Sequence, residues 1–389
     1  MVGPVPDLPF VKGTCPNKGT STINFETAEL CVSLAKASQT IEALVPKVAT
    51  GFDFTPADLL SARSQPGYMH LGDITLRWRA GASGAWQNTS SATSRTAVTA
   101  KAASGDVLAA ADLAPALPST LPLSITRTWS TQGGRLGLRF DITNRSQAPV
   151  QVGALGFPMV FNNVLTNRTL EQAHNGCSFA DPYVGRDAGY LQVTRLNGQG
   201  PALLVLPDTH TSFEAYAPVL DPPKAGSKDP VAVFTDPTPR SNTFEGFYEW
   251  LAHSKAYAEQ EWSQAQPWNP ATDVTLGPGE SKSYGLQFVL APQIRSIEQQ
   301  LAQNQRPVAI GIPGYILPLD VEGKLFLNYP WPVKDLSVEP AGALELAAQA
   351  PTPGGYQAYQ VLGKSWGRAR LTVTYDNGVV QTTHYDLVK

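Results

Sequence analysis

The chain has 389 residues, of which 42% are hydrophobic and 16% charged, with a formal net charge of -3. A chain of this length and composition can bury a large core in about two or three domains, which excludes a disordered protein. The low charge provides no basic stripe for phosphates and no polybasic run, so we expect neither nucleic acid nor membrane partners. No apolar run approaches the roughly 20 residues of a transmembrane helix. "MVGPVPDLPF" lacks the basic and apolar segments of a signal peptide, and it is compatible with a mature N-terminus that carries an added Met.

Glycine and proline, with 33 residues each, separate short runs of the kind that form β-strands. In chain order these runs include "INFETAELCVSL", "GDITLRWR", "LSITRTWS", "RLGLRFDIT" and "APVQVGALGFPMVF". Each alternates or runs apolar and is bounded by Gly, Pro, Asn or Ser. We therefore expect a mostly β protein in which residues 1–290 form a large antiparallel two-sheet sandwich, or supersandwich.

A short helical pattern follows the large sandwich. In "QIRSIEQQLAQNQRP", Ile294, Ile297 and Leu301 recur at helical spacing, which predicts a helical linker over residues 291–307. Beyond it, "KLFLNY", "RARLTVTY", "VVQTTHYDL" and similar runs predict short strands separated by turns. This rhythm indicates a small immunoglobulin-like β-sandwich over residues 308–389.

Three cysteines, Cys15, Cys31 and Cys177, allow at most one intramolecular disulfide. Cys15 and Cys31 are close enough in sequence to join an N-terminal hairpin in an oxidising compartment, and the alternative is three unpaired cysteines. We predict the Cys15–Cys31 bond in a secreted, extracellular protein. No second Cys or His lies at ligand spacing from these residues, and Gly-rich nucleotide loops are absent, so no metal or cofactor is expected.

Three Asn-x-Ser/Thr sequons begin at Asn88, Asn144 and Asn167. In a secreted glycoprotein such residues lie on the surface and carry glycans. Sequons also arise by chance in a chain with this Ser/Thr content. They therefore agree with a secreted glycoprotein without establishing it.

One segment departs from the strand pattern, namely "FEGFYEWLAHSKAYAEQEW" at residues 244–262. Phe247 and Leu251 belong to an apolar stripe at helical spacing, which predicts one helix packed on the sheet. Glu249 and His253 fall on the opposite stripe, which we interpret as a solvated charged face. One His with one Glu falls short of the two-His pattern of a zinc site, so no metal is expected here.

The flank of this predicted helix carries the candidate substrate-binding residues. Trp250, Tyr257 and Glu261 line up between the two stripes, and Trp268 and Asn269 follow in "WNP". Ring faces suit the C–H side of a pyranose and a carboxylate accepts its hydroxyls, so this set suits a sugar site. The alternative, which the sequence favours, is that Trp250 and Tyr257 pack against the next domain.

A second group of carboxylates lies in "CSFADPYVGRDAGY", where Asp181 and Asp187 neighbour Tyr183 and Tyr190. Glycoside hydrolysis needs two carboxyl groups about 5–10 Å apart. Aspartates in such contexts are also ordinary turn formers, and we favour that interpretation. Because no G-x-S-x-G occurs, serine hydrolase chemistry is not indicated, and the catalytic residues stay unidentified.

Several segments, among them "DPYVGRDAGYLQVTRLNGQGPALLVLPD", "FEGFYEWLAHSKAYAEQEW" and "IGIPGYILPLD", resemble the N-terminal portion of fungal secreted, uncharacterised proteins of six-hairpin-glycosidase-like architecture. In that group a β-supersandwich and a small β domain precede an α-toroid. The resemblance implies that the general acid and base lie in the toroid. Since this chain ends at "THYDLVK" without a series of amphipathic helices, we expect them in a missing α-toroid domain or a partner chain.

Two functions follow as hypotheses. In the first, the chain is the β-sandwich portion of a secreted carbohydrate-active enzyme of the glycoside hydrolase type, which contacts an oligo- or polysaccharide but is not catalytic alone. In the alternative, it is a stand-alone carbohydrate-binding or surface-interaction protein. A longer reading frame or a helical partner favours the first, whereas a self-contained aromatic platform favours the second.

Overall fold

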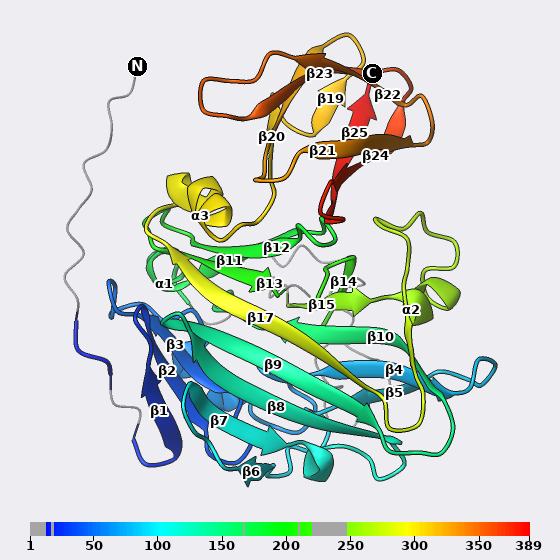
Figure 1. The fold of residues 1–389 in the computed structure, drawn as a ribbon. Coiled ribbons are helices and arrows are strands. Elements are labelled where there is room, and N and C mark those ends of the chain that lie inside the picture. The colour runs from blue at the N-terminus through cyan, green and yellow to red at the C-terminus, as the bar shows by residue number, and fades with distance from the viewer. Residues whose placement is uncertain (1–12, 17–18, 166–167, 209–210, 220–246) are drawn as a thin grey trace.

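The computed structural model describes residues 13–16, 19–165, 168–208, 211–219 and 247–389. As expected, this part of the chain is mostly β, with several antiparallel sheets and few helices. Figure 1 shows a large lower body and a smaller C-terminal body stacked on it. Among the described residues, no helix is both long enough and apolar enough to cross a membrane.

Two large sheets form the lower body. The strands of the first are β6 (Thr99–Lys101), β7 (Val107–Asp112), β8 (Leu123–Gln132), β9 (Arg135–Asn144), β11 (Ser178–Tyr183), β12 (Tyr190–Arg195), β13 (Ala202–Pro207) and β17 (Ser281–Ala291). Those of the second are β4 (Thr75–Ala80), β5 (Gln87–Ser90), β10 (Val150–Met159), β14 (Ala215–Pro218), β15 (Tyr248–His253) and β16 (Val274–Leu276). The first sheet has the order β11-β12-β13-β17-β9-β8-β7-β6, and the second β14-β15-β10-β4-β5, with β16 pairing with β10.

The two sheets pack face to face around one core. Phe140 of β9 and Phe157 of β10 stack across it, with ring centroids 5.9 Å apart. Strand β8 shows why the sequence pattern works, because its burial alternates along most of its length, with one side chain in the core and the next toward solvent. Both sheets are antiparallel throughout, so the lower body is the predicted antiparallel two-sheet sandwich.

A third sheet covers one end of the large sandwich. Its strands are β1 (Thr22–Glu26), β2 (Leu30–Ala35) and β3 (Ile41–Pro46), in the order β1-β2-β3. Cys31 of β2 forms a disulfide with Cys15, and the two Cα atoms are 5.6 Å apart. Cys177 is buried, and its thiol donates to the carbonyl of Val164 at 3.5 Å. The Cys15–Cys31 disulfide therefore ties the segment before β1 to β2, the central strand of this small sheet.

The C-terminal body consists of two four-stranded sheets. Their strands are β18 (Val308–Ile312), β19 (Ile316–Pro318), β20 (Glu322–Asn328), β21 (Val333–Glu339), β22 (Leu344–Gln349), β23 (Gln357–Gly363), β24 (Gly367–Tyr375) and β25 (Val380–Val388). The orders are β18-β20-β23-β22 and β19-β25-β24-β21, and β19 pairs parallel with β25. Leu325 of β20 and Leu371 of β24 belong to the core between these sheets, which we call the C-terminal sandwich.

Short helices connect the sheets. They are η1 (Ala57–Leu59), η2 (Ser61–Arg63), η3 (Ala114–Ala116), α1 (Leu170–Gly176), α2 (Lys255–Glu259), η4 (Ile294–Ser296) and α3 (Ile297–Gln303). The helical spacing of the predicted linker corresponds to η4 and α3. Ile297 and Leu301 of α3 are buried in a cluster with Leu204 of β13 and Val308 of β18, so the helix packs where the two sandwiches meet.

The predicted helix at residues 244–262 is wrong for most of its described length. Residues 248–253 form strand β15, and only Lys255–Glu259 are helical; residues 244–246 lie outside the described part. Strand β15 lies between β14 and β10, with Trp250 in the main core and Leu251 buried on the opposite face. A strand covered on both faces has no period of two, so its apolar run can match a helical stripe by coincidence.

Candidate functional site

The five predicted substrate-binding residues do not come together in space, and two of them are core residues. Trp250 has no exposed surface, and its ring lies 4.3 Å from that of Phe213. Asn269 is buried, and its Nδ2 donates to the carbonyls of Val184 and Glu214, both at 2.8 Å. Trp250 and Asn269 therefore stabilise the fold and offer nothing to a ligand, which corrects the prediction for both.

Tyr257 and Glu261 lie in another place, beside strand β4. Tyr257 is stacked between the guanidinium of Arg77, at 3.6 Å from its ring, and the ring of Trp262, at 4.6 Å. Arg77 also pairs with Glu261 at 2.6 Å. Both predicted residues line a pocket of about 500 Å³, but their polar and aromatic groups are already used by these neighbours. They form a packed side-chain cluster more than an open sugar platform.

Glu249 and His253 are buried, which corrects the predicted solvated face. Glu249 accepts from the hydroxyl of Tyr257 at 2.5 Å and from Thr75, and burial raises the pKa of its carboxyl. His253 contacts the hydroxyl oxygens of Thr272 and Tyr284 at 2.7 and 2.8 Å, and burial lowers its pKa to about 4. In the part of the chain that the structure describes, no group of three or more His, Cys, Asp or Glu could hold a metal ion.

The predicted glycosylation sites differ in their accessibility. Asn88 is exposed on β5. Asn144 is completely buried, and its Nδ2 donates to the carbonyls of Ala148 and Leu276 at 2.8 Å each, so the folded chain has no room for a glycan there. Asn167 lies outside the described residues. The prediction for Asn144 is therefore wrong, because the sequon motif says nothing about burial.

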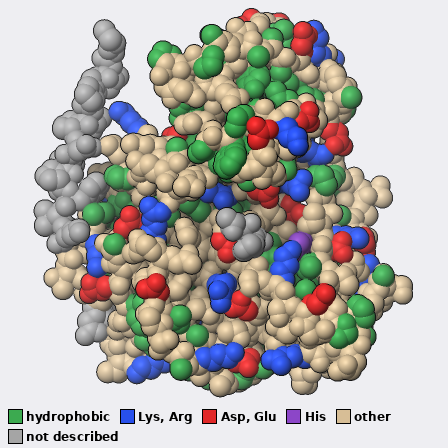
Figure 2. Space-filling model, viewed as in Figure 1, with side chains coloured by type: hydrophobic (Ala, Val, Ile, Leu, Met, Phe, Trp, Pro, Cys, Tyr) green, Lys and Arg blue, Asp and Glu red, His purple; other side chains and the backbone are tan. Residues whose placement is uncertain are grey.

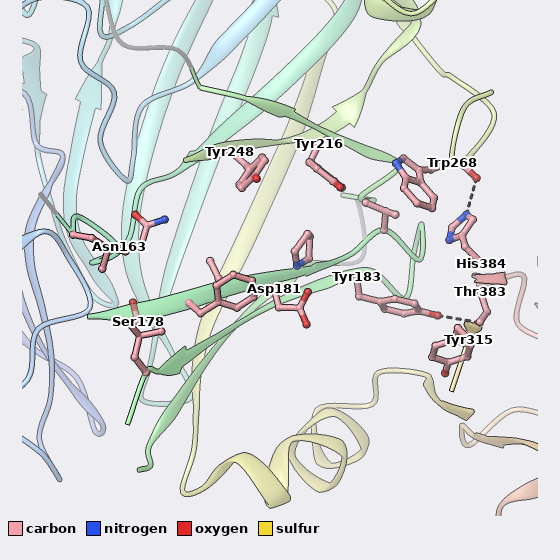
Figure 3. A pocket seen from close by; sticks show the side chains of 16 residues that line it. Asn163, Ser178, Asp181, Tyr183, Tyr216, Tyr248, Trp268, Tyr315, Thr383 and His384 are labelled. Carbon is pink, nitrogen blue, oxygen red and sulfur yellow. Dashed lines mark hydrogen bonds between the residues drawn. The ribbon is translucent and has the colours of Figure 1, made fainter. Parts of the chain in front are cut away.

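Trp268 lies in a cavity of about 490 Å³, which we call the aromatic cleft. The cleft is bounded by β11 and β14, which are the outermost strands of their sheets in the described part of the chain, by Tyr248 of β15, by Tyr315 just before β19, and by strand β25 of the C-terminal sandwich. Six aromatic side chains line it, namely Phe179, Tyr183, Tyr216, Tyr248, Trp268 and Tyr315. In Figure 3, Tyr248, Tyr216 and Trp268 lie in a row that faces Asp181 and Tyr183.

Strand pairing sets the first wall of the aromatic cleft. In the β14–β15 register, Tyr216 lies opposite Trp250 and Pro218 lies opposite Tyr248. Tyr216 and Tyr248 are thus diagonal neighbours across the pair, and their rings meet edge to face at 5.3 Å. Both rings are half-buried and line the cleft, and β14 is the outermost strand of its sheet in the described part of the chain.

The opposite wall is strand β11, where Phe179, Asp181 and Tyr183 alternate along one face. Gln192 of β12 donates to Oδ2 of Asp181 at 3.1 Å. Although Asp181 keeps contact with solvent, its partial burial raises the pKa of the carboxyl. The hydroxyl of Tyr183 donates to the carbonyl of Thr382 at 2.7 Å, which ties this wall to β25.

His384 of β25 and Trp268 form the third side. His384 Nε2 lies 2.7 Å from the carbonyl oxygen of Trp268, and because a carbonyl only accepts, this nitrogen carries the proton. Burial, together with Arg370 and Arg368, lowers the pKa of His384 to about 4, so the ring is neutral at pH 7 and Nδ1 is an acceptor. The guanidinium of Arg368 lies 3.9 Å from the ring of Trp268 and holds the indole in place.

The cleft can therefore bind through ring faces, hydroxyl groups, one carboxylate and one neutral imidazole. Among the described residues that line it, Asp181 supplies the one carboxylate. Asp187 does not face Asp181; its Oδ2 accepts from the backbone N–H of Val380 at 2.9 Å, and it lines a different groove. The two aspartates do not form a catalytic pair in one cavity, which agrees with the turn interpretation for Asp187.

Sequence reasoning missed Tyr216, Tyr248 and His384 as members of one site. His384 lies in "VVQTTHYDL", which predicts a strand, Tyr248 lies in the segment whose spacing predicts a helix, and Tyr216 lies in "SFEAYAPV", a run with no feature of a binding site. The sequence holds a weak signal, since Tyr216 alternates with the buried Ala215 and Ala217. The sequence does not show that β11, β14 and β25 lie close together. The cleft exists only because these three strands meet in the fold.

The chain belongs to the family described as "Family of unknown function (DUF5695)", whose model matches residues 33–389. No curated protein matches the chain. Among solved structures, a polysaccharide lyase aligns with a TM-score of 0.62 at 11% identity, over 92% of this chain and 46% of the lyase chain. A galactose mutarotase-like protein from Lactobacillus casei aligns with a TM-score of 0.39 at 11% identity, over 69% of this chain and 100% of that protein. A putative aldose 1-epimerase from Escherichia coli K12 has the same TM-score at 10% identity, over 70% and 99%.

The similarity to the lyase shows a shared fold, and this chain spans less than half of the lyase chain. The other two alignments score too low to support an argument. The matched family has no assigned function, so it says less about this chain than the resemblance to six-hairpin-glycosidase-like proteins would imply. Fungal origin, a secreted glycoprotein and a relation to six-hairpin glycosidases remain predictions.

Proposed function

We propose that this chain is the glycan-binding β-sandwich portion of a carbohydrate-active enzyme, and that the aromatic cleft holds the sugar. The observation that carries the proposal is the row of Tyr248, Tyr216 and Trp268 facing Asp181 across a cavity of about 490 Å³. Ligand sites of this kind are concave, mostly apolar and fitted with a few polar groups, with volumes of about 300–1,000 Å³. The shared fold with a polysaccharide lyase agrees with this proposal.

Each group in the cleft has a role in the proposed complex. Tyr216 and Tyr248 present ring surface to the C–H side of a pyranose, and their hydroxyls donate to ring substituents. Asp181 accepts from sugar hydroxyls through charge-assisted hydrogen bonds, which are stronger than neutral ones. His384 Nδ1 is a second acceptor at the far end of the cleft. Because its tautomer is fixed, this nitrogen accepts a hydrogen bond from the sugar and does not donate one.

In this proposal the cleft binds and orients the glycan, and the bond-breaking groups come from elsewhere. Glycoside hydrolysis requires a general acid and a second carboxylate. Among the described residues that line the cleft, only Asp181 carries a carboxyl group. We propose that the acid and base come from a helical domain or partner chain, as the sequence resemblance implies for glycoside hydrolases of the six-hairpin type. Secretion belongs to the same proposal, and the Cys15–Cys31 disulfide supports it because such bonds persist in oxidising compartments.

A second candidate is a stand-alone carbohydrate-binding or surface-interaction protein. It is favoured by the fact that the rings, the carboxylate and the imidazole all come from this one chain, so binding needs no partner. Turnover of a polysaccharide by a longer gene product, or by the chain combined with a helical partner, would decide for the enzyme.

The test compares binding by the purified chain and two substituted chains. Affinity electrophoresis is run in gels that contain starch, galactomannan, hydroxyethyl cellulose, mixed-linkage β-glucan, alginate or polygalacturonate. Tyr216→Ala removes a cleft ring, and Trp366→Ala, whose indole is 68% exposed on the C-terminal sandwich, is the matched control. We expect Tyr216→Ala to weaken binding about tenfold, with no effect of Trp366→Ala and no sugar released. Equal binding by all three chains would overturn the assignment of the cleft.

A further inference from the structure

A second cavity lies where the large sandwich meets the C-terminal sandwich, and we call it the junction groove. Its volume is about 970 Å³, close to twice that of the aromatic cleft. Strands β13 and β17 supply one side, the residues after α3 the floor, and the loops that flank β21 and β24 the rim. Figure 2 shows positive and negative side chains interspersed on the face below the C-terminal sandwich.

The junction groove and the aromatic cleft are separated by the loop between β11 and β12. Tyr183, at the start of this loop, lines the cleft, whereas Asp187, four residues later, lines the groove. The two cavities share no lining residue among those described. A ligand of one cavity therefore need not touch the other, and substitutions can address them separately.

Charge in the junction groove is balanced. Two arginines, Arg139 and Arg306, and two aspartates, Asp187 and Asp208, are its charged lining residues in the described part of the chain. Arg306 donates to the backbone carbonyl of Asp187, and the Asp187 carboxylate accepts from the N–H of Val380 at 2.9 Å. Two positive and two negative side chains give no net attraction for an anionic or a cationic ligand, so the groove suits a neutral one.

Carboxamides supply most of the remaining hydrogen-bonding groups. Five of them line the groove, namely Gln132, Gln287, Asn304, Gln305 and Asn377. Gln287 Nε2 donates to Gln132 Oε1 at 3.0 Å, and Asn377 Nδ2 donates to the hydroxyl of Tyr329 at 3.0 Å. These bonds fix the amides and leave the oxygen of Gln287 and the NH₂ of Gln132 for a ligand. An acceptor next to a donor matches the neighbouring hydroxyls of a sugar.

The rim of the junction groove carries an exposed indole. Trp331 lies between Pro330 and Pro332 in the connection from β20 to β21, and 50% of its surface is exposed. The flanking prolines restrict the backbone on both sides, so little conformational freedom remains to be lost when a ligand stacks on the ring. Beside it, Tyr329 packs edge to face on Tyr375 at 4.7 Å, which anchors the base of this connection.

We propose that the junction groove is a second carbohydrate site, which binds a stretch of a neutral polysaccharide. Trp331 is the stacking platform, and the amides of Gln132 and Gln287 bind sugar hydroxyls on the opposite side. A volume of about 970 Å³ has room for more than one sugar ring, whereas the aromatic cleft, at about 490 Å³, encloses less space. This site does not depend on the function proposed for the cleft.

Affinity electrophoresis of the full chain tests the proposal, with the same four neutral and two acidic polysaccharides. Trp331→Ala and Gln287→Ala remove the platform and one amide, and Trp366→Ala is the control, since it removes a more exposed indole that lies outside the groove. All three side chains are half-buried or exposed, so the variants are expected to fold, and a thermal unfolding scan checks this. We expect Trp331→Ala to weaken binding of at least one neutral polysaccharide about fivefold. Gln287→Ala should weaken it less, and Trp366→Ala should leave it unchanged.

Three results would overturn the proposal. The first is that no neutral polysaccharide retards the unsubstituted chain, and the second is that Trp331→Ala and Gln287→Ala behave like Trp366→Ala with every neutral polymer. The third is that the loss in Trp331→Ala is confined to alginate or polygalacturonate. Tyr216→Ala distinguishes the two sites, because a loss in that variant alone supports the cleft and rejects the groove, whereas a loss in Trp331→Ala alone does the reverse.

Discussion

The hydroxyl of Thr382 donates a hydrogen bond of 2.7 Å to Oδ1 of Asn269, across 113 residues of sequence. Asn269 also donates to the carbonyls of Val184 and Glu214, so its oxygen and both amide hydrogens are bonded in a buried place. One side chain thus joins the loop that carries Trp268, the strand end beside Tyr183 and strand β25 of the C-terminal sandwich. A fully satisfied buried polar network of this kind makes the walls of the cleft rigid.

We predict that Asn269→Ala is strongly destabilising. The change leaves two buried carbonyls and a buried hydroxyl without this partner, and each such group costs about 1–3 kcal/mol. The free energy of unfolding, measured with urea and followed by circular dichroism, should fall by about 3 kcal/mol or more. Asn88→Ala, at an exposed position on β5, is the control and should change it by less than about 0.5 kcal/mol. A loss below about 1 kcal/mol in Asn269→Ala would show that the buried polar network between the two sandwiches does not depend on this residue.

Stability should decrease below neutral pH because of buried histidines. Burial lowers the pKa of His253 to about 4, below its usual 6.5, so the folded state binds fewer protons than the unfolded state between these values. The free energy of unfolding is therefore highest above pH 6.5 and falls as the pH drops toward 4, by up to about 3 kcal/mol for this residue. His70 and His384, whose pKa values are also lowered to about 4, act in the same direction.

Urea titrations at several pH values check this dependence. His253→Gln should reduce the slope of stability against pH, whereas His174→Gln, at an exposed position on α1, should not. A slope that is unchanged in His253→Gln would mean that the imidazole is protonated as easily in the folded chain as in the unfolded one.

Glycan binding in the cleft should depend on the ionisation of Asp181. Its pKa is raised by partial burial, so the carboxylate is lost on acidification earlier than an exposed aspartate would be. Because the ionised form makes the stronger hydrogen bonds, the affinity should fall as the pH is lowered from neutrality, and the fall should begin at a higher pH than an exposed aspartate would give. Asp181→Asn should bind several-fold more weakly at pH 7 and show little dependence on pH. An identical pH profile for both proteins, measured by calorimetry, would remove Asp181 from the binding site.

The Cys15–Cys31 disulfide should stabilise the chain measurably. It closes a loop with a sequence separation of 16 residues, for which restriction of the unfolded chain contributes about 3 kcal/mol. The double variant Cys15→Ala, Cys31→Ala should lose about 2–3 kcal/mol in urea unfolding. Peptide mapping without reductant should recover the two cysteines in one linked pair. Alkylation of both in the native protein would contradict the bond.

Some features followed from the sequence because their causes are local. Strand β8 alternates between core and solvent, and α3 keeps Ile297 and Leu301 on one face, so both were visible as periodic patterns. Strand β15 could not be recognised in this way, because Trp250 and Leu251 are buried on opposite faces and the sequence therefore lacks the alternation of a strand. Its apolar spacing then resembled a helix.

The candidate site was predicted only in part, because its members meet through long-range contacts. Trp268 was identified from its chemistry, but its partner His384 lies 116 residues away, and no local pattern connects them. Asp181 was weighed as a turn former, and only the edge position of β11 shows that it borders a cavity. Asn269 carries an amide of the kind that binds ligands, but its side chain is buried and bonded within the fold. Only its burial, which the sequence does not show, distinguishes the two roles.

The central claim is that the aromatic cleft binds a sugar, and a crystal structure of the chain with an oligosaccharide from a polysaccharide that it retains tests this most directly. The account predicts a pyranose ring stacked against Tyr216 or Tyr248, with a hydroxyl within hydrogen-bonding distance of Asp181. An oligosaccharide bound elsewhere on the chain, with the cleft free of sugar at saturating concentration, would contradict it.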